Sequence, residues 1–178
     1  MIKKIAILGS TGSIGKSTID ILRKDKKNFD VVLLTTNNNY REILKQAKEF
    51  KARNIIINNK KHYLTSKKKL RNNKINIFNN FQSFNNKFKS KIDFSMSAIS
   101  GLEGLKPTLD LIKFSKTIAI ANKESIICAW NLIQQRLNKY KTEFIPVDSE
   151  HFSIWSLLDG NSSNSVEEVI ITASGGPF

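Results

Sequence analysis

The stretch from Lys4 to Arg23 constrains the fold most, because it reads in order as a strand, a glycine turn and a helix. Residues 5–8 (IAIL) form a short apolar run, which is typical of a strand buried on both faces of a parallel sheet. Glycine then occupies every third position, at Gly9, Gly12 and Gly15. A residue without Cβ permits a sharp reversal and lets a ligand approach the bare backbone. The positions that next recur with helical spacing are Ile14, Ser17, Thr18, Ile21 and Leu22.

This turn has the properties of an anion-binding site. The first N–H groups of a helix have no intrahelical partner, and the helix start carries about half a positive charge, which favours a pyrophosphate. The spacing here is Gly-x-x-Gly-x-x-Gly. The standard dinucleotide fingerprint is Gly-x-Gly-x-x-Gly, so the match is good without being unique. A glycine-rich turn that binds nothing is the alternative interpretation.

A P-loop is a further alternative, because Gly15, Lys16 and Ser17 resemble the end of a Walker A motif. The motif fails by one position, since its first glycine would have to stand where the sequence has Ser10. A dinucleotide-binding turn is therefore the preferred interpretation.

Length and composition predict one globular domain followed by the start of a second. The chain has 178 residues, 40% of them hydrophobic, which is enough for a real core. Its formal net charge of +14 would ordinarily indicate a nucleic acid or an anionic membrane as partner. The excess Lys is accompanied by Asn in residues 58–91, and these two types rise together when codon usage is AT-rich. A solvated surface is thus preferred, and we expect no nucleic-acid and no membrane partner.

The sequence also predicts a cytoplasmic location in a bacterium, with a plastid as the less favoured alternative. Cys128 is the only cysteine, so no internal disulfide can form, which indicates a reducing compartment. The apolar run after Lys4 has four residues, far short of a signal peptide. No apolar segment of the roughly eighteen residues that would span a membrane is present.

Strands and helices are expected to alternate along the chain. After the first unit, strands are expected at residues 31–35, 54–57, 75–78, 93–99, 117–121, 144–147 and 166–172. Helices are expected at residues 40–53, 61–72, 81–88, 102–115, 123–140 and 152–158. This alternation predicts an α/β fold with a mostly parallel sheet and right-handed crossovers. Pro146 cannot donate a backbone hydrogen bond, so its strand is expected to be an edge strand or to have the proline where the strand begins.

The end of the second strand bears on the choice of cofactor. In NAD-binding proteins an acidic residue about twenty positions beyond the glycines accepts the ribose hydroxyls. Here the chain instead has Asn37, Asn38 and Asn39, followed by Tyr40 and Arg41. Neutral donors and a guanidinium tolerate a 2′-phosphate, so the pattern favours NADP over NAD.

Another polar cluster follows the strand at residues 117–121, where the nicotinamide end of a cofactor could arrive. Lys123 is suited to hydrogen-bond a substrate oxygen or phosphate, and Asn122 and Glu124 to orient the cofactor. The alternative is that Asn122 is an ordinary helix N-cap, with Lys123 and Glu124 filling the first turn.

The clearest candidate metal ligands are Asp148 and Glu150. In an extended segment their carboxylates would leave on the same side, and like charges about 6 Å apart repel by roughly 3 kcal/mol at an effective dielectric near 20. Exposure to water or a divalent cation would offset this repulsion, and oxygen ligands select Mg²⁺ or Mn²⁺ over zinc. The neighbouring His151 could equally cap the next helix or pack.

Ser174 and Cys128 each allow two interpretations. Ser174 and the two glycines after it follow the last expected strand, and bare amides with a hydroxyl suit a phosphate monoester as well as a plain turn. Cys128 invites a nucleophile interpretation, but we expect it to be buried in the middle of a helix and therefore inert. The sequence ends with an expected strand and a glycine loop, and no later element would cover that strand. We therefore expect more protein to follow.

Four motifs together resemble one family: AILGSTGSIG at residues 6–15, ANKES at 121–125, PVDSEH at 146–151 and ASGGPF at 173–178. The chain resembles 1-deoxy-D-xylulose 5-phosphate reductoisomerase, an enzyme of non-mevalonate isoprenoid biosynthesis, over its whole length. The resemblance implies a Rossmann-like NADPH-binding domain at residues 1–146 and an incomplete catalytic domain at residues 147–178. The resemblance also implies that the chain corresponds to less than half of a full-length member of the family. The full-length enzyme is expected to be a homodimer.

The resemblance also implies a role for individual residues. The residues implied to bind NADPH are Thr11, Gly12, Ser13, Ile14, Asn37, Asn38, Asn39, Asn122 and Glu124. Those implied to bind Mg²⁺ or Mn²⁺ are Asp148 and Glu150, and those implied to bind the sugar phosphate are Lys123, Ser149, Glu150 and Ser174. The implied catalytic residues are Lys123, Asp148 and Glu150.

The implied reaction is the NADPH-dependent reductive isomerisation of 1-deoxy-D-xylulose 5-phosphate to 2-C-methyl-D-erythritol 4-phosphate. Many relatives have glycine and a basic residue where this chain has Asn37 and Asn38, so its 2′-phosphate affinity is expected to depend either on Arg41 or on no basic residue of this segment. We expect the 178-residue chain to bind NADPH but to be inactive alone. The alternatives are another NADP-dependent dehydrogenase and a basic nucleic-acid-binding module.

Overall fold

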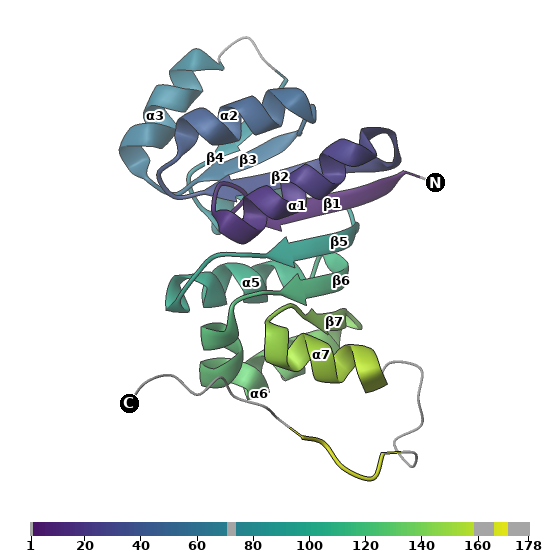
Figure 1. Cartoon of the computed structure of the whole chain (residues 1–178). Coiled ribbons are helices and arrows are strands. Elements are labelled where there is room, and N and C mark those ends of the chain that lie inside the picture. The colour runs from purple at the N-terminus through teal and green to yellow at the C-terminus, as the bar shows by residue number, and fades with distance from the viewer. Residues whose placement is uncertain (1, 71–73, 159–165, 171–178) are drawn as a thin grey trace, which may run out of the picture.

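The computed structural model describes residues 2–70, 74–158 and 166–170, and these contain one seven-stranded sheet (Figure 1). All neighbouring strands pair in parallel, in the order β4-β3-β2-β1-β5-β6-β7. The strands are β1 (Lys3–Leu8), β2 (Phe29–Thr36), β3 (Asn54–Ile57), β4 (Asn76–Phe78), β5 (Ile92–Ser97), β6 (Ser115–Ile120) and β7 (Glu143–Pro146). The predicted α/β, Rossmann-like parallel sheet is therefore confirmed.

Helices cover both faces of the sheet (Figure 1). They are α1 (Ser13–Lys24), α2 (Tyr40–Glu49), α3 (Lys60–Lys69), α4 (Phe81–Lys87), α5 (Leu105–Ile112), α6 (Lys123–Tyr140) and α7 (Ser149–Leu158), with 3₁₀ turns η1 (Lys26–Asn28) and η2 (Leu102–Gly104). One apolar core joins α1, α2 and α3 to one face, and a second core joins α4, α5 and α6 to the other.

Strand β1 lies at the centre of both cores. Ile5 and Ile7 belong to the core beneath α1 and α2, whereas Ala6 and Leu8 belong to the opposite core. Side chains of a strand alternate between the two faces, so a strand that is buried on both sides must be apolar at every position. The continuous IAIL run thus specifies the central strand.

The strand order creates a crevice at the carboxyl end of β1. From β1 the chain adds β2, β3 and β4 on one side, then crosses to the other side of β1 to add β5, β6 and β7. The loops that follow β1 and β5 therefore leave in opposite directions, and ligands of parallel sheets bind at such a switch point. In Figure 1 the carboxyl ends of the labelled strands point to the left, where α1 begins.

Several predicted elements coincide with the observed ones, and the differences have local causes. The bounds of β3 and α6 were predicted as observed, and the proline-containing β7 is an edge strand of the described sheet, as predicted. The helix predicted at 102–115 ends at Ile112. Its continuation is already turning into β6, because the Phe114 carbonyl accepts a hydrogen bond (2.8 Å) from the Ile92 N–H at the start of β5.

Two predictions near the end of the chain were wrong. Helix α7 begins at Ser149 rather than at residue 152. Residues 166–170 are exposed and do not form the predicted strand, and residues 171–172 lie outside the described part. Among the described strands β7 pairs only with β6, so the 166–170 segment has no sheet partner that would hold it extended.

The expectation that Cys128 is buried was also wrong, since its side chain is exposed on α6. The buried residues of this helix are Ser125, Ile133 and Leu137, which are separated by multiples of four positions, and Cys128 lies off that stripe. The backbone is non-helical at Ala129 (φ −142°, ψ 29°), so α6 is kinked one residue later. In the described residues no helix combines the length and the apolar character needed to cross a lipid bilayer.

An ion-pair cluster beside η1 makes stability dependent on pH. Glu49 accepts hydrogen bonds from Arg23 and lies 2.7 Å from Lys26, and these two cations lower the pKa of Glu49 from 4.5 to about 2. A lowered folded-state pKa means that the stabilisation is complete above pH 4.5 and is lost as the pH falls towards about 2.

We therefore expect Glu49→Gln to reduce the free energy of unfolding at pH 7 by about 1 kcal/mol, because partly exposed ion pairs contribute little more. The difference from the parent chain should shrink steadily when urea unfolding is repeated between pH 4.5 and pH 2.5. Glu168→Gln, in the exposed 166–170 segment, is the matched control and should have no such effect. An unchanged difference at pH 2.5 would contradict this account.

Candidate dinucleotide and metal site

The glycine turn after β1 is held in place by the end of β2. The Gly9 N–H donates to Thr35 Oγ1 (2.8 Å), and the Ser10 N–H donates to the Thr35 carbonyl (3.0 Å). Gly9 has φ +72°, a conformation that favours glycine, and a Cβ there would lie 2.7 Å from the Ala98 carbonyl oxygen. The turn is therefore fixed between the loops that follow β2 and β5.

Gly15 permits α1 to pack directly on the turn. A Cβ at Gly15 would overlap the Gly9 carbonyl oxygen and would lie 2.6 Å from Ser10 Cα. Gly12 differs, because it is exposed, has φ −80°, and its Cβ would lie 3.4 Å from the Gly9 carbonyl oxygen. Two of the three glycines are thus required by the protein's own packing.

The start of α1 is open to a ligand. Gly12 is the N-cap residue, and in the described chain no side chain caps this helix and no acidic residue stands in its first turn. Ser13 and Ile14 are exposed. The N–H groups of a first helical turn have no intrahelical partner and lie at the positive end of the helix dipole. The geometry therefore suits an anion, as the sequence predicts.

Sequence reasoning missed Thr36 and Gln46, which support the turn. Thr11 Oγ1 lies 2.7 Å from Thr36 Oγ1, and the buried Gln46 donates from Nε2 to the Ser10 carbonyl (3.1 Å). A signal was available for Gln46, which occupies a core-facing position of the amphipathic α2 between Ile43 and Ala47. A polar residue at such a position indicates a buried hydrogen bond.

The polar cluster after β2 is partly used within the protein. Asn39 caps α2 by accepting from the Glu42 N–H (3.3 Å), and Asn38 Oδ1 accepts from Asn59 (3.0 Å). Arg41 is exposed, and its hydrogen bond to Tyr40 lowers the pKa of that phenol. The guanidinium is therefore the cation within the predicted 37–41 cluster.

Asn122 is an N-cap residue, which confirms the structural alternative for this side chain. Its Oδ1 accepts from the Ser125 N–H (2.9 Å), and its Nδ2 donates to the carbonyls of Ile99 and Gly101 (2.6 Å each). The residue is 2% exposed, and its amide hydrogens and the oxygen are engaged by these bonds. Asn122 thus ties the loop after β5 to the start of α6, while Lys123 and Glu124 are exposed beside it.

The expectation that Asp148 and Glu150 share an extended segment was wrong. Asp148 directly precedes α7 and accepts from the His151 N–H (3.1 Å), as an N-cap does, because this closes the free start of the helix. Glu150 lies in the first turn of α7, where its Oε2 accepts from the Ser149 hydroxyl (2.9 Å).

The two carboxylates differ in environment. Burial acts to raise the pKa of Asp148, but hydrogen bonds from the His151 backbone and ring (Nδ1–Oδ1 2.6 Å) more than offset it and lower the pKa. The other oxygen, Asp148 Oδ2, is buried and has no hydrogen-bond partner among the described residues. The pKa of Glu150 is lowered by its own backbone N–H and by Ser149, and also by the charge of Lys123.

The electrostatic effect of Lys123 on Glu150 indicates that the clusters after β6 and β7 are neighbours. The described residues contain no group of three or more His, Cys, Asp or Glu side chains that could hold a metal ion. Asp148 and Glu150 therefore form an incomplete ligand set by themselves. Ser174 lies outside the described residues.

A parallel sheet with a glycine turn and an open helix start at its central strand is typical of dinucleotide-binding α/β proteins. The chain matches the family described as 1-deoxy-D-xylulose 5-phosphate reductoisomerase over residues 5–130, and the C-terminal domain of the same enzyme over residues 144–178. It belongs to the 1-deoxy-D-xylulose 5-phosphate reductoisomerase family.

Two relatives bear the family name. A 1-deoxy-D-xylulose 5-phosphate reductoisomerase of Pelagibacter ubique is 61% identical over 178 residues, which cover 99% of this chain and 46% of that relative. One of Caldanaerobacter subterraneus subsp. tengcongensis is 40% identical, with coverage of 99% and 46%. The chain thus spans less than half the length of these relatives.

Solved structures of the family share the fold. The enzyme of Zymomonas mobilis in complex with NADPH is 33% identical and superposes with a TM-score of 0.77, covering 85% of this chain and 40% of that one. A family structure in complex with NADPH, fosmidomycin and magnesium is 28% identical, with a TM-score of 0.79 and coverage of 90% and 41%.

The unequal roles of the glycines can be tested. We expect Gly15→Ala to destabilise the chain by about 3 kcal/mol or more, because the new methyl group overlaps buried backbone that cannot move aside. Gly12→Ala should change the free energy of unfolding by less than about 1 kcal/mol, since its Cβ meets only ordinary contacts. Urea unfolding of both variants would check this, and equal losses would contradict the packing role of Gly15.

Proposed function

We propose that this chain is the NADPH-binding part, with two metal ligands, of a 1-deoxy-D-xylulose 5-phosphate reductoisomerase. The proposed reaction is the NADPH-dependent reductive isomerisation of 1-deoxy-D-xylulose 5-phosphate to 2-C-methyl-D-erythritol 4-phosphate in isoprenoid biosynthesis. The observation that carries the proposal is the uncapped start of α1 at the β1/β5 crevice, in a chain that belongs to this family. The proposed division is a cofactor domain at residues 1–146 and the start of a catalytic domain at residues 147–178.

The residues present fit a reduced dinucleotide. The first turn of α1 is exposed, and its N–H groups can donate hydrogen bonds to a pyrophosphate. In this proposal the backbone of residues 11–14 holds the pyrophosphate. The 37–39 asparagines and Arg41 offer no carboxylate that would repel a 2′-phosphate. When bound, NADPH supplies the hydride.

Further along the crevice we assign the nicotinamide half to the loop that joins β6 to α6. Glu124 is exposed there and can accept hydrogen bonds from the cofactor. Asn122 acts mainly by positioning, because its side-chain amide already binds Ile99, Gly101 and Ser125. It fixes the two loops between which the cofactor must lie.

The carboxylates fit a hard divalent cation. Asp148 Oδ2 is buried without a hydrogen-bond partner among the described residues, which is costly for a carboxylate oxygen unless a cation approaches it. Glu150 is exposed in the adjacent first turn of α7 and can turn towards the same point. Such oxygens suit Mg²⁺ or Mn²⁺, which would polarise the oxygens of the substrate when bound.

The substrate phosphate and hydroxyls are assigned to residues around these carboxylates. Lys123 supplies a positive charge next to Glu150, and Ser149 supplies a hydroxyl. Ser174 is assigned to the phosphate from its motif alone. We propose a sugar phosphate as the substrate, the bacterial cytoplasm as the location and a homodimer as the state of the full-length enzyme.

Arg41 tests the cofactor assignment. We expect NADPH to stabilise the 178-residue chain, by about 2.7 kcal/mol at a concentration of 100 Kd. Arg41→Ala should weaken NADPH binding about tenfold while leaving NADH binding nearly unchanged, because only NADPH carries the 2′-phosphate. Thermal melting with each nucleotide would measure this.

The control for Arg41 is Lys27→Ala, which removes an exposed cation in η1, before the amino end of β2, whereas Arg41 follows the carboxyl end of that strand. A parent chain that NADPH does not stabilise would contradict the cofactor proposal. Equal losses for both nucleotides in Arg41→Ala would contradict the specificity of Arg41 alone.

The substitution Asp148→Asn tests the metal-binding role of Asp148 separately from its role as a helix cap. Asparagine caps helices as well as aspartate does, so α7 should persist. Loss of a direct ligand should weaken Mn²⁺ binding by at least the roughly tenfold that outer-shell partners contribute. Titration of the chain with Mn²⁺, followed by the electron paramagnetic resonance of the free ion, would measure this.

Asp25→Asn, at the far end of α1, is the matched control and should bind Mn²⁺ as the parent does. We expect no turnover from the 178-residue chain, because its described carboxylates form an incomplete ligand set. Mn²⁺ independence of a full-length relative would favour the alternative of another NADP-dependent dehydrogenase.

A further inference from the structure

Two cations converge on the phenol of Tyr40, the first residue of α2. The Lys69 Nζ lies 5.5 Å from the centre of the half-buried Tyr40 ring, and the central carbon of the Arg41 guanidinium lies 6.0 Å from the same point. Arg41 also donates a hydrogen bond to the phenol oxygen. Arg41 belongs to α2 and Lys69 to α3, so the two positive charges come from different helices.

The contact between the loops after β2 and β3 brings these helices together. The Asn59 side chain donates to Asn38 Oδ1 (3.0 Å). The helices that leave the two loops therefore start side by side, and the Tyr40 and His62 rings stack with their centroids 4.9 Å apart. Lys69 lies in the last turn of α3, and its side chain extends back to Tyr40, because helical side chains incline towards the N-terminus.

The protein does not neutralise either cation. In the part of the chain that the structure describes, Arg41 and Lys69 form no ion pair with a carboxylate. Arg23 and Arg53 differ, because each is paired with an acidic side chain. Like charges that converge without a counter-ion repel each other, and an anion between them removes this cost. The pair therefore suits an anionic ligand.

The electrostatic potential at the phenol already favours a negative charge. The hydrogen bond from Arg41 lowers the pKa of Tyr40, and the charge of Lys69 acts in the same direction. Burial has the opposite effect, but the two cations outweigh it. A phosphate monoester carries roughly two negative charges at pH 7, so the same cations would stabilise it.

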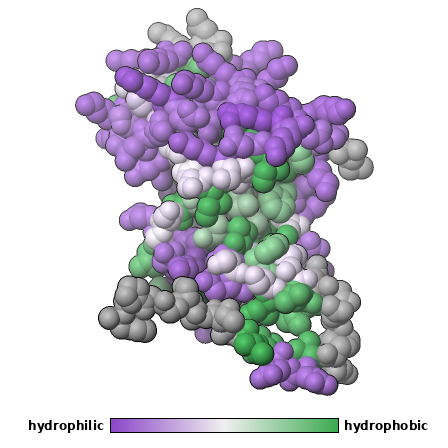
Figure 2. Space-filling view, in the orientation of Figure 1, coloured by the Kyte–Doolittle hydropathy of each residue, from purple (hydrophilic) through white to green (hydrophobic). Residues whose placement is uncertain are grey.

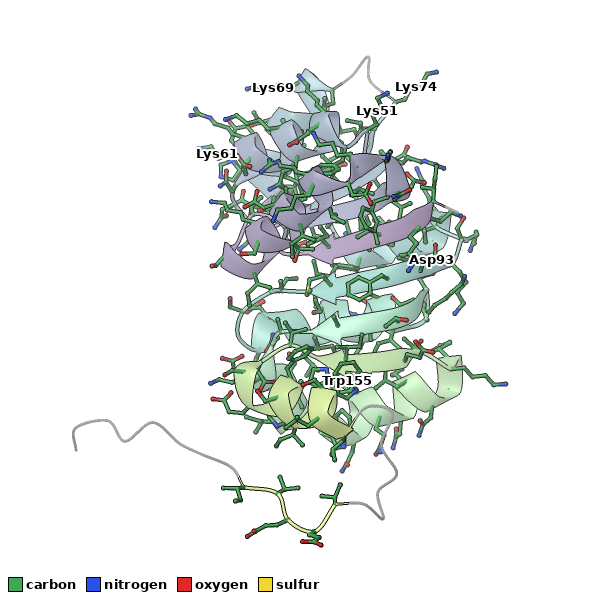
Figure 3. The ribbon with its side chains drawn as sticks, turned by 45° about the vertical axis from the view of Figure 1, so that its right-hand side comes forward. Lys51, Lys61, Lys69, Lys74, Asp93 and Trp155 are labelled. Atoms are coloured by element: carbon green, nitrogen blue, oxygen red, sulfur yellow. The ribbon has the colours of Figure 1, made fainter. Side chains whose placement is uncertain are left out.

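The site lies beside the loop that follows β2. The Tyr40 N–H donates to the Asn38 carbonyl in that loop (2.8 Å). Figure 3 shows Lys69 at the end of the molecule that also carries Lys61, and Trp155 towards the other end. Figure 2 shows that hydrophilic residues cover the α2–α3 end. In dinucleotide-binding sheets the end of this strand reads the 2′ position of the adenosine ribose.

We propose that Lys69, together with Arg41, binds the 2′-phosphate of NADPH, and that Tyr40 is a positioning residue for both cations. The inference deepens the proposed function and rests on it, because it concerns the adenosine end of the same cofactor. Arg41 offers a planar fork to two phosphate oxygens, and Lys69 offers a compact point charge. The preference for NADPH over NADH is therefore set by two helices and not by the loop after β2 alone.

The experiment measures how strongly NADPH and NADH stabilise the 178-residue chain and its variants in thermal melting, from which the dissociation constants follow. We expect Lys69→Ala to weaken NADPH binding about tenfold and to change NADH binding by less than about twofold, because only NADPH carries the 2′-phosphate. Lys69→Arg keeps the charge and should retain most of the affinity for NADPH.

The matched control is Lys68→Ala, which removes the neighbouring exposed lysine of α3 and changes the net charge by the same amount. It should bind both nucleotides as the parent chain does. Equal losses of NADPH binding in Lys68→Ala and Lys69→Ala would overturn the proposal. Equal losses of NADPH and NADH binding in Lys69→Ala would also overturn it.

A double variant tests whether the two cations share one phosphate. Arg41→Ala combined with Lys69→Ala should bind NADPH no more tightly than NADH. A double variant that still prefers NADPH would overturn the proposal.

Tyr40 has a readout of its own. Tyr40→Leu removes the ring that holds the cations and should weaken NADPH binding about threefold without affecting NADH. In the parent chain labelled with ¹³C-tyrosine, bound NADPH should raise the pKa of the Tyr40 phenol, because the phosphate offsets the two cations. NADH should leave the Tyr40 titration unchanged. A Tyr40 titration that NADPH does not alter would overturn the proposed contact.

The parent chain separates this inference from the proposed function. If neither nucleotide stabilises the parent, both the proposed function and the inference are contradicted. If NADPH stabilises the parent and the preference for NADPH is unchanged in Lys69→Ala and Tyr40→Leu, only the inference is overturned. A parent chain that binds NADPH and NADH equally tightly would overturn the inference and leave the dinucleotide site.

Discussion

The contact between Gly15 and the Gly9–Ser10 backbone is the constraint on which the rest of the site depends. Because no Cβ intervenes, the first turn of α1 lies directly against the reversal that follows β1. The helix start is thereby directed at the crevice between β1 and β5, where its N–H groups are left for an anion. A larger residue at position 15 would push α1 away from the Gly9–Ser10 backbone, and the helix start would no longer be directed at the crevice.

Around this contact the carboxyl ends of the strands are tied together by side chains that take no part in chemistry. Thr35 and Gln46 hold the glycine turn from the β2 side. Asn122 joins the loop after β5 to the start of α6. Buried polar groups need hydrogen-bond partners, and these bonds join each loop to its neighbour. Lys123 and Glu150, which follow β6 and β7, extend the same edge, and the charge of Lys123 helps to lower the pKa of Glu150.

Most of the fold could be predicted because strands buried on both faces and amphipathic helices leave local signals in the sequence. The IAIL run and the helical spacing after it identify β1 and α1 without any long-range information. Predictions failed where a distant partner decides the outcome. Residues 166–170 have the composition of a strand but pair with none of the described strands, and Cys128 lies on a face of α6 that the described chain does not cover.

The sequence by itself determined the α/β class, the central strand, the position of the glycine turn and the family, since each depends on short motifs with fixed spacing. Only the tertiary structure decided that the Asn122 side chain caps α6 and that Gln46 supports the glycine turn. It also decided that Asp148 and Glu150 lie at the start of a helix. The physical reason is that hydrogen-bond partners and burial are set by residues remote in the chain, which meet only when the sheet is assembled.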